Sequence, residues 1–372
     1  MGRLAAPCIA RETVTKAVRI LIVAPTPPPL GGQAIQARRL LEKLPEVPGL
    51  EVGFVSVNPA LPGLLGALQR VKYVRTIVTS VAYAWSLLRH VPRCDIVHAF
   101  SASYWSFLLA PVPAMLAAKL FRKRIVLNYR SGEADDHLAH WRSAGWGIRL
   151  ADRVVAPSGY LVDVFARHGY AAEAIHNFVD TALVRHRERI GAGTRFFANR
   201  HFEPLYNVAC VVRAFAIVQR TLPHATLTLA GDGSERAALE RVVADLSLRN
   251  VRFTGRVPMT EMAALYDEAD IYLNAPNIDN MPGSVIEAFA AGLPVASTSA
   301  GGIPYIVSDG VTGLLVPVDD HDALGRAALR LAQEPGLAQR LSASAYTALQ
   351  EKYVWPAVRE RWAALYRELA SS

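Results

Sequence analysis

The chain has 372 residues, with 40 Lys and Arg against 32 Asp and Glu and a formal net charge of +8. This length exceeds what one ordinary hydrophobic core needs, so two domains are predicted. Hydrophobic residues make up 52% and charged residues 19%, which excludes a disordered protein. Cys8, Cys94 and Cys210 are far apart and have no neighbouring Cys or His cluster, which argues against a disulfide framework or a zinc site.

The positive charge is concentrated in the first half of the chain. Residues 1–190 hold 24 basic and 13 acidic side chains, whereas residues 191–372 hold 16 and 19. The first half could therefore face anionic lipid or an anionic acceptor, or the charge could be only a solvated basic surface. Nucleic acid is not an expected partner, because the basic residues are not interleaved with a nucleic-acid-binding motif.

Short apolar runs alternate with helix-like sequence through the first half. The first run, residues 18–24, ends in the turn-rich PTPPPLGG, and a helical pattern follows it. This alternation predicts a parallel sheet covered on both faces, with residues 1–190 as a first Rossmann-like domain. The further predicted strands of this domain are 51–57, 94–100, 123–129 and 151–158.

Three segments of the first half bear on membranes. The first ten residues lack the apolar core of a signal peptide, and Ala6 breaks the myristoylation pattern. Residues 99–118 are uncharged and long enough to span a bilayer, but Pro111 and Pro113 interrupt them, so a strand, a loop and a core helix are predicted. Residues 64–91 mix apolar and basic side chains, which is typical either of a membrane-surface segment or of a core-facing helix pair with basic edges.

The strand–helix alternation restarts after residue 190. Residues 191–354 are therefore predicted to form a second Rossmann-like domain, and an amphipathic final helix, 355–372, to cross back and pack on the first. Ligands of such sheets bind at the carboxyl ends of the strands, so the cleft between the two domains is the predicted site. The predicted strands are 194–200, 225–233, 251–257, 270–276, 293–299 and 312–318.

Several strand ends carry residues suited to an anionic ligand. Gly31-Gly32 opens a helix after a strand, where backbone amides can approach a phosphate or sugar, although an ordinary turn has the same composition. It matches neither GxGxxG nor the P-loop. Arg200 ends a strand and could hold a diphosphate bidentately, or it could be a solvated loop residue.

The stretch NIDNMPGSVIEAFAAGLPV, residues 277–295, contains two carboxylates, Asp279 and Glu287. Ser284 and Glu287 match the capping box Ser-x-x-Glu, so Glu287 could only cap a helix. A strand leads directly into this turn, however, and the helix behind it would direct its positive end at the cleft. Both carboxylates could then accept hydrogen bonds from the hydroxyls of a sugar and a ribose.

Taken in order, these motifs resemble those of the retaining glycosyltransferases of family 4, which have the GT-B fold. The resemblance covers residues 18–369. In the second half it rests on Arg200, the GDG at 231–233, Asp279-x7-Glu287 running into EAFAAGLPV, Gly301-Gly302 and the DGVTGLLVPVDD at 309–320. In the first half, Gly31-Gly32, DIVHAFSAS (95–103) and IHNFVD (175–180) fit the same family.

The resemblance implies a nucleotide-sugar donor in the second domain and an acceptor in the first. Arg200 would contact the diphosphate with help from backbone amides near Met281, Pro282, Gly283 and Ser284. Glu287 would bind the ribose, Asp279 the donor sugar, and Gly255, Arg256 and Val257 would lie near the base. Family members usually need no metal and no cofactor, since the nucleotide-sugar is a substrate and Arg, Lys and helix dipoles stabilise the leaving diphosphate.

The sequence departs from the family pattern at several positions. Tyr206 stands where a Lys is expected, so one charge-assisted hydrogen bond, worth roughly 1.5–3 kcal/mol, is missing. Arg130 lies where a His is common; it could supply positive charge across the cleft but cannot serve as a general base at neutral pH. Asp279 replaces a Glu, and Tyr305 stands where Glu is common. A donor site rebuilt with other residues is the favoured interpretation.

The function predicted from sequence is transfer of a sugar, with retention of configuration, to a glycan or lipid-linked acceptor in cell-surface polysaccharide or glycolipid synthesis. The enzyme would work in the cytoplasm, with peripheral binding at the inner face of the membrane as an open possibility. A non-catalytic nucleotide-sugar-binding or scaffold subunit is the alternative, given the missing Lys and His. A sugar-nucleotide epimerase with the GT-B fold is a third reading, which the segment from Asp279 to Glu287 disfavours.

Overall fold

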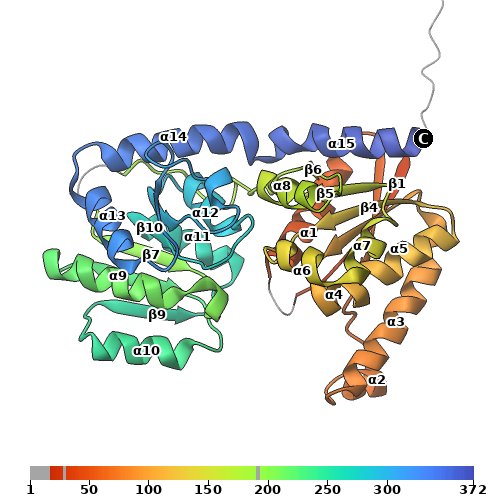
Figure 1. Cartoon of the computed structure of the whole chain (residues 1–372), viewed down its shortest axis with the longest axis horizontal. Coiled ribbons are helices and arrows are strands. Elements are labelled where there is room, and N and C mark those ends of the chain that lie inside the picture. The colour runs from red at the N-terminus through yellow and green to blue at the C-terminus, as the bar shows by residue number, and fades with distance from the viewer. Residues whose placement is uncertain (1–16, 28–30, 190–192) are drawn as a thin grey trace, which may run out of the picture.

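A computed structural model describes residues 17–27, 31–189 and 193–372. The chain folds into two domains, each built on a six-stranded sheet with helices packed around it (Figure 1). The paired strands of both sheets are parallel. The predicted two-domain α/β fold is therefore confirmed. The predicted domain boundary, between residues 190 and 191, falls outside the described residues.

The first sheet has the strand order β2-β1-β3-β4-β5-β6. Its strands are β1 (Val18–Ala24), β2 (Leu50–Ser56), β3 (Ile96–Ser101), β4 (Arg124–Tyr129), β5 (Arg153–Ala156) and the short β6 (Glu173–Ala174), which the sequence patterns did not indicate. The helices of this domain are α1 (Gly32–Lys43), α2 (Gly63–Leu68), α3 (Val74–His90), α4 (Tyr104–Leu109), α5 (Pro111–Leu120), α6 (Ala134–His140), α7 (Arg142–Ile148) and α8 (Gly159–Arg167), with 3-10 turns η1 (Leu44–Glu46) and η2 (Val91–Arg93).

The second sheet has the strand order β12-β11-β10-β7-β8-β9. Its strands are β7 (Arg195–Asn199), β8 (Thr226–Ala230), β9 (Val251–Gly255), β10 (Ile271–Asn274), β11 (Val295–Thr298) and β12 (Leu314–Val316). The helices that follow residue 193 are α9 (Val208–Thr221), α10 (Arg236–Asp245), α11 (Met259–Glu268), α12 (Gly283–Ala290), α13 (His321–Gln333), α14 (Leu337–Lys352) and α15 (Trp355–Ser371), with η3 (Pro204–Tyr206) and η4 (Ile303–Tyr305).

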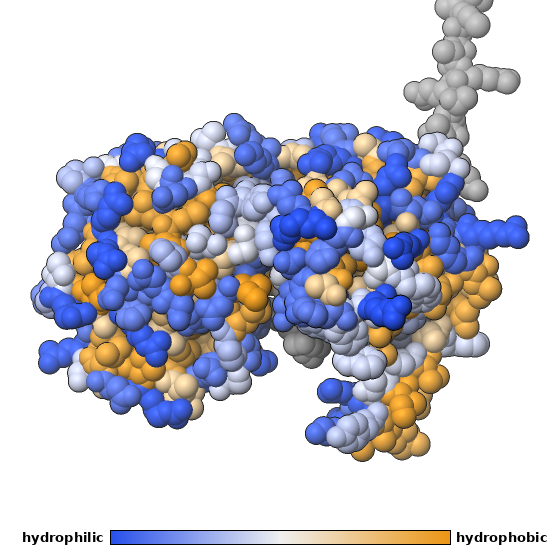
Figure 2. Space-filling view, in the orientation of Figure 1, coloured by the Kyte–Doolittle hydropathy of each residue, from blue (hydrophilic) through white to orange (hydrophobic). Residues whose placement is uncertain are grey.

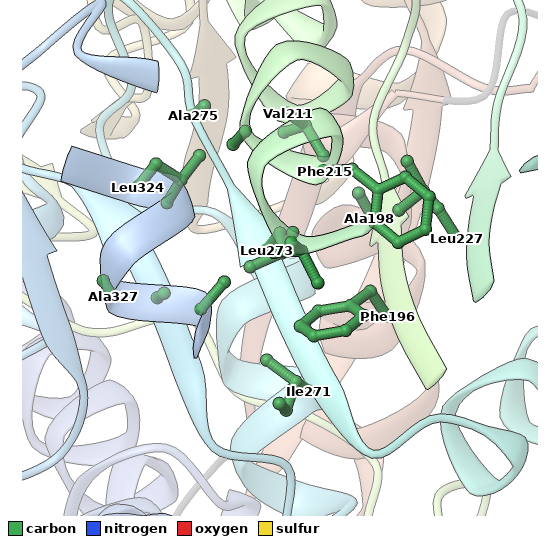
Figure 3. Close-up of a cluster of buried hydrophobic side chains, with 14 of the residues drawn as sticks. Phe196, Ala198, Val211, Phe215, Leu227, Ile271, Leu273, Ala275, Leu324 and Ala327 are labelled. Atoms are coloured by element: carbon green, nitrogen blue, oxygen red, sulfur yellow. The ribbon is translucent and has the colours of Figure 1, made fainter. Parts of the chain in front are cut away.

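The core of the second domain lies between its sheet and the helices α9 and α13. Phe196, Leu273 and Leu324 are buried there, and the rings of Phe196 and Phe215 meet edge to face at 5.9 Å (Figure 3). Alternate residues of a buried parallel strand point to opposite faces, so the neighbouring Phe197 belongs to a different cluster with Tyr266 and Tyr272. Packing on both faces fixes the register of β7 and hence the position of the loop after it.

The last helix returns to the first domain, as predicted. In Figure 1, α14 and α15 run along one side of both domains. Trp355, Val358 and Trp362 of α15 are buried in a cluster with Ile20 and Ile22 of β1. The final helix therefore closes the core of the first domain, and one segment of chain joins the two halves a second time.

The uncharged segment 99–118 is divided among the end of β3, α4 and α5. Among the described residues, no helix is both long and apolar enough to cross a membrane. The predicted strand and core helix are found, and Ala114 and Met115 of α5 are fully buried in the first domain. The predicted loop is instead largely the short helix α4, whose Phe107 is buried as well. Cys94 and Cys210 are buried free thiols, whereas Cys8 lies outside the described residues.

The helices α2 and α3 project from the first domain (Figure 1). α2 has no buried residue, and α3 buries only Tyr83 and Leu87. The interpretation of residues 64–91 as a core-facing helix pair therefore holds for only one face of α3, which packs on the first-domain core. α2 and the other face of α3 are in contact with solvent.

Candidate functional site

Each sheet has one point where the strand order reverses. In the second sheet, the chain passes from β7 outward to β9, then returns to β10 on the other side of β7. The loops after β7 and β10 therefore diverge, and ligands of such sheets bind at the carboxyl ends of strands at this point. We refer to this region, between the two loops, as the crevice. Arg200 directly follows β7, and Asp279 lies in the loop after β10. The two residues thus flank the switch point.

Arg200 is the centre of this crevice. Its Nη1 donates to Ser284 Oγ at 3.1 Å, and its Nη2 donates to Asp279 Oδ2. The guanidinium carbon lies 4.1 Å from the centre of the Tyr206 ring, a cation–π contact. The fold thus brings together four residues that span positions 200 to 284 of the sequence.

The charge of Arg200 is held in a nearly buried position, with only 11% of its side chain exposed. Burial lowers the pKa of Arg200, but the nearby Asp279 carboxylate outweighs it, so the pKa is raised overall. Its buried Nε has no hydrogen-bond partner among the described residues. Arg200 is therefore a fixed cation with hydrogen-bonding capacity to spare, which suits an anionic ligand.

Four glycines let backbone segments pass close to the Arg200 and Asp279 loops. A methyl group on Gly231 would lie 2.0 Å from the Arg200 carbonyl oxygen, and one on Gly233 would lie 2.4 Å from that of Phe202. A methyl group on Gly301 or Gly302 would lie 2.2 or 1.9 Å from the carbonyl oxygen of Asp279 or Asn280. The GDG and GG motifs thus support the two loops, since only glycine permits such approach.

The start of α12 differs from the capping-box interpretation. Pro282 occupies the N-cap position, and no side chain caps the helix. Ser284 Oγ instead accepts the hydrogen bond from Arg200. The first amides of α12 are consequently not engaged by Ser284 or Glu287 side chains, and a helix start of this kind attracts negative charge.

Glu287 is held by two partners that the sequence patterns did not indicate. Its Oε1 accepts from Arg39 Nη2 of α1 at 2.9 Å, and its Oε2 accepts from Tyr266 Oη at 3.1 Å. The Arg39 and Glu287 side chains are 9% and 14% exposed. Glu287, the residue predicted to bind the ribose, is thus part of a nearly buried ion pair between the domains. Its carboxylate has lone pairs left for a further hydrogen-bond donor.

Arg130 follows β4 and connects the first domain to the loop before α12. Its guanidinium donates to Asn128 Oδ1 at 3.2 Å and to Asn177 Oδ1, and Asn177 Nδ2 donates to the Met281 carbonyl oxygen at 3.2 Å. Burial lowers the pKa of Arg130 to about 9, so it keeps its positive charge at neutral pH. Arg130 thus contributes positive charge on the side of the crevice opposite Arg200.

Behind Arg130, a chain of buried polar groups reaches α15. Asn128 Nδ2 donates to His98 Nε2 at 3.0 Å, so the other ring nitrogen of His98 carries the proton and donates to Tyr366 Oη at 2.8 Å. Burial lowers the pKa of His98 to about 3, with the Arg130 charge acting in the same direction. His98 is therefore a neutral hydrogen-bonding group inside the fold.

The two domains meet around the loop that contains Asp279. Ser158 Oγ donates to Asn280 Oδ1, and a methyl group on Gly132 would lie 3.4 Å from the carbonyl carbon of Asp279. Tyr305, the residue where Glu was expected, donates to Asp163 Oδ2 at 2.5 Å. Tyr305 therefore joins the domains rather than facing Arg200.

The other residues predicted to bind the donor lie near strand ends and make fewer contacts. Gly31 is the N-cap of α1, and methyl groups on Gly31 or Gly32 would meet no atom of the described residues within 4 Å. Gly255 ends β9 with φ +72°, and Arg256 beside it is exposed and 3.7 Å from Asp232. Val257 packs against the core cluster of α12.

No sequence pattern singled out Arg39 or Tyr266, and Asn177 was included only as part of IHNFVD (175–180). Arg39 and Tyr266 are brought to the crevice by tertiary folding rather than by a local motif, Arg39 from α1 and Tyr266 from α11. The signal available for Arg39 was its place about two helical turns after Gly31-Gly32, in the helix that those glycines open. Among the described residues, no three His, Cys, Asp or Glu side chains are grouped as a metal site would need.

Two protein-family models match the chain. The model described as Glycosyltransferase Family 4 matches residues 30–183, and the one described as Glycosyl transferases group 1 matches residues 194–334. Each match lies within one of the two domains, and each includes one side of the crevice described above.

Two curated proteins give the scale of the sequence similarity. Glycogen synthase from Mycobacterium tuberculosis is 27% identical over 292 residues, which are 74% of this chain and 69% of that protein. Phosphatidyl-myo-inositol mannosyltransferase from Mycobacterium leprae is 30% identical over 181 residues, 48% of this chain and 47% of that protein.

Solved structures show the same fold at lower sequence identity. HepE from Anabaena, in complex with UDP and glucose, has a TM-score of 0.74 at 17% identity, covering 94% of this chain and all (100%) of that one. Sucrose-phosphate synthase from Thermosynechococcus elongatus has a TM-score of 0.77 at 20% identity, covering 95% and 100%. With family matches in both domains, two parallel sheets and this shared fold, the chain belongs to the GT-B glycosyltransferases.

Proposed function

We propose that the protein transfers a sugar from a nucleotide-sugar donor to a glycan or lipid-linked acceptor, with retention of configuration and without a metal. The observation that carries this proposal is the position of Arg200 at the switch point, between Asp279, Ser284 and the Tyr206 ring. A nearly buried cation beside an uncapped helix start is a site for a diphosphate.

The donor diphosphate would bind between Arg200 and the segment Met281–Ser284, which leads into α12 and includes its first two residues. Arg200 would exchange part of its contact with Asp279 for the diphosphate, which frees the Asp279 carboxylate to accept from hydroxyls of the donor sugar. The Arg200 guanidinium, the helix start and Arg130 would together stabilise the negative charge of the leaving diphosphate. These groups are the basis for proposing catalysis without a metal or other cofactor.

Glu287 would accept hydrogen bonds from the ribose with its remaining lone pairs, while Arg39 and Tyr266 hold the carboxylate in place. The base would lie towards Gly255, Arg256 and Val257, and Gly31-Gly32 would leave space for the donor on the first-domain side. No protein nucleophile is assigned, because none of these residues is placed by its contacts for attack on a sugar carbon.

The acceptor would bind the first domain beside an aromatic cluster. α4 and α6 follow the carboxyl ends of β3 and β4, on the same edge of the sheet as Arg130. Trp105 is 67% exposed, and its ring meets Trp141 edge to face at 5.5 Å. Exposed indole faces contact the apolar faces of sugar rings. The Mycobacterium leprae relative, named for phosphatidyl-myo-inositol, supports a lipid-linked acceptor.

The proposed place of action is the cytoplasmic face of a membrane, in cell-surface polysaccharide or glycolipid synthesis. The buried free thiols Cys94 and Cys210 suit a reducing compartment. Burial raises the pKa of Cys94 to about 11 and that of Cys210 to about 12, so both remain inert thiols.

The test is a pair of measurements on Arg200→Ala. Thermal shift against UDP-, GDP-, ADP- and CDP-sugars first identifies the donor, and transfer is then followed with that donor. The variant would lose the two hydrogen bonds that the Arg200 guanidinium is proposed to donate to the diphosphate, each worth about 1.5–3 kcal/mol. Turnover is therefore expected to fall at least about 100-fold, while acceptor affinity changes little.

Asn250→Ser is the control, because Asn250 lies before β9, away from the crevice. Wild-type activity of Arg200→Ala would remove the diphosphate assignment. Donor binding by the wild type without any transfer would instead favour the non-catalytic subunit, the alternative that Tyr206 in place of Lys leaves open.

A further inference from the structure

One side of the first domain carries a stripe of exposed apolar side chains. On α3, Ile77, Val81 and Trp85 are 66%, 65% and 69% exposed, and Leu88 continues the stripe. On α2, Leu64 and Leu65 are exposed as well. Figure 2 shows this hydrophobic surface on the projecting part of the molecule, away from α15. Large contiguous apolar surfaces of this kind mark interaction sites.

The stripe is not needed to attach α3 to the fold. At about 100° per residue, positions 77, 81, 85 and 88 lie on one face of the helix, whereas the buried Tyr83 and Leu87 lie on another. Tyr83 also donates to the Ala110 carbonyl oxygen at 2.7 Å. α3 therefore has one apolar face that packs on the domain and a second that contacts no described part of the chain's core.

The stretch of sequence that contains this stripe is almost entirely positive in charge. Residues 52–132 contain a single acidic residue, Asp95, against ten basic residues: Arg70, Lys72, Arg75, Arg89, Arg93, Lys119, Arg122, Lys123, Arg124 and Arg130. Arg70, Lys72, Arg75 and Arg89 belong to the α2–α3 segment and are exposed. Tyr73, at the turn between the helices, is 77% exposed and has the Lys72 ammonium 5.4 Å from its ring centre.

We propose that the α2–α3 segment, residues 63–90, docks the protein on an anionic lipid bilayer. The apolar stripe would enter the boundary between headgroups and acyl chains, with Trp85 and Tyr73 at the depth that amphipathic aromatic rings favour. The basic side chains would reach outward to anionic headgroups. Charge complementarity selects this occupant over a second copy of the chain, because two such basic surfaces repel each other.

The surface extends beyond α3. α5 packs against α3 in the first-domain core, and its Leu116 and Leu120 are exposed while Lys119 lies between them. Apolar residues next to basic ones thus recur on the adjacent helix. A broad surface of this kind would fix the orientation of the first domain on the bilayer, rather than tether it by one helix.

The experiment is co-sedimentation of the full chain with vesicles, which needs no donor and so succeeds or fails independently of the proposed transfer. Phosphatidylglycerol–phosphatidylcholine vesicles are compared with pure phosphatidylcholine vesicles at low and high salt. Binding is expected to the anionic vesicles at low salt and to decline as salt rises. The triple variant Ile77→Ser/Val81→Ser/Trp85→Ser is expected to bind at least tenfold more weakly.

A charge variant, Arg70→Gln/Lys72→Gln/Arg75→Gln, is expected to lose about fivefold in affinity for each charge removed. The matched control replaces exposed apolar residues of the second domain, Leu246→Ser/Val311→Ser/Val318→Ser, and is expected to bind as the wild type does. Melting temperatures verify that each variant is folded, which is expected because the replaced side chains are exposed.

Absence of wild-type binding to anionic vesicles at low salt would overturn the proposal. So would a control variant that loses as much binding as the α3 variant. A wild-type dimer that the α3 variant dissociates, without vesicle binding, would assign the stripe to a second copy of the chain instead.

Discussion

The ring of Tyr206 provides a support for Arg200 in place of a second cation. A Lys at this position would repel Arg200 unless an anion lay between them, whereas the Tyr206 ring attracts the guanidinium at 4.1 Å. Asp279 balances the remaining charge. The Arg200 guanidinium, the Asp279 carboxylate and the Tyr206 ring therefore stabilise one another when no ligand is bound. A diphosphate would bind by competing with Asp279 for Arg200.

The close approach at Gly302 leads to a prediction. In Gly302→Ala the added methyl group would lie 1.9 Å from the Asn280 carbonyl oxygen, so the Asp279 loop must shift. Because productive geometry tolerates little displacement, we expect turnover to fall at least about tenfold, with donor affinity reduced as well. Steady-state kinetics and calorimetric donor titration measure these effects.

Gly283→Ala is the comparison, since a methyl group there meets nothing within 4 Å. Its melting temperature should match the wild type, and any loss of activity in it would indicate that the methyl group occupies space used by a ligand. Unchanged activity in Gly302→Ala would show that the position of the Asp279 loop does not matter.

From sequence, the residues that the second domain brings to the crevice were easier to predict than those that the first domain brings. Arg200, Asp279 and Ser284 could be identified because each follows a strand of the same sheet, and the carboxyl ends of neighbouring parallel strands converge. Arg39 could not, since it reaches Glu287 from the other domain, 248 positions away. The contact depends on how the domains meet, which no local pattern encodes.

At the scale of elements, α12 connects the second-domain part of the crevice to the first domain. Its start holds Ser284 against Arg200, and one turn later Glu287 pairs with Arg39 of α1. The capping-box pattern was misleading because both of its residues are used by tertiary partners, which are stronger here than the local alternative. A helix that loses its own cap in this way depends on the domain contact for its position.

The Arg39–Glu287 ion pair therefore makes a testable contribution to stability. Replacing Arg39 by Met leaves the Glu287 carboxylate nearly buried and without its cation, which costs about 3–5 kcal/mol when a buried pair is broken on one side. We expect the free energy of unfolding in urea to fall by an amount of this order and donor affinity to fall with it.

The double variant Arg39→Met/Glu287→Gln should recover part of the lost stability, because no unpaired charge remains. The exposed pair Arg252–Glu268 is the control, since breaking it should cost no more than about 1 kcal/mol. Equal losses for the exposed and the nearly buried pair would contradict this account.

The exposed position of α2 and α3 could not be decided from sequence. Their apolar spacing is the same whether the partner of a helical face is a protein core or an external surface, so periodicity alone gives no answer. The two-domain architecture was more accessible, because eleven strands with helices between them leave few alternatives to parallel sheets. Only β6, with two residues, was too short to leave a signal.

On the scale of the whole molecule, the buried His98 links stability to pH. The pKa of His98 is lowered to about 3 in the fold, chiefly by burial. The unfolded chain therefore takes up a proton near pH 6.5 while the folded chain does not, so stability declines as pH falls from about 6.5 towards 3. From pH 7.5 to pH 5, this group alone should cost about 2 kcal/mol.

Urea unfolding at these two pH values measures the effect. In His98→Gln, which keeps hydrogen-bonding groups but cannot titrate, the loss on acidification should be smaller by about that amount. His140→Gln, at an exposed position, should behave as the wild type. An identical pH dependence in His98→Gln would mean that other groups determine the acid sensitivity.

The return of α15 to the first domain also has a consequence for the order in which the protein is made. Trp355, Val358 and Trp362 cover Ile20 and Ile22 of β1, yet they leave the ribosome only after all the strands of the second domain. The second domain has its whole sheet available earlier. Although domains generally fold from the amino end onward during synthesis, here the amino-terminal domain must wait for the carboxyl-terminal helix. Until α15 is made, the face of the first-domain sheet that it covers stays exposed to solvent. An exposed apolar face of this kind is a binding site for chaperones.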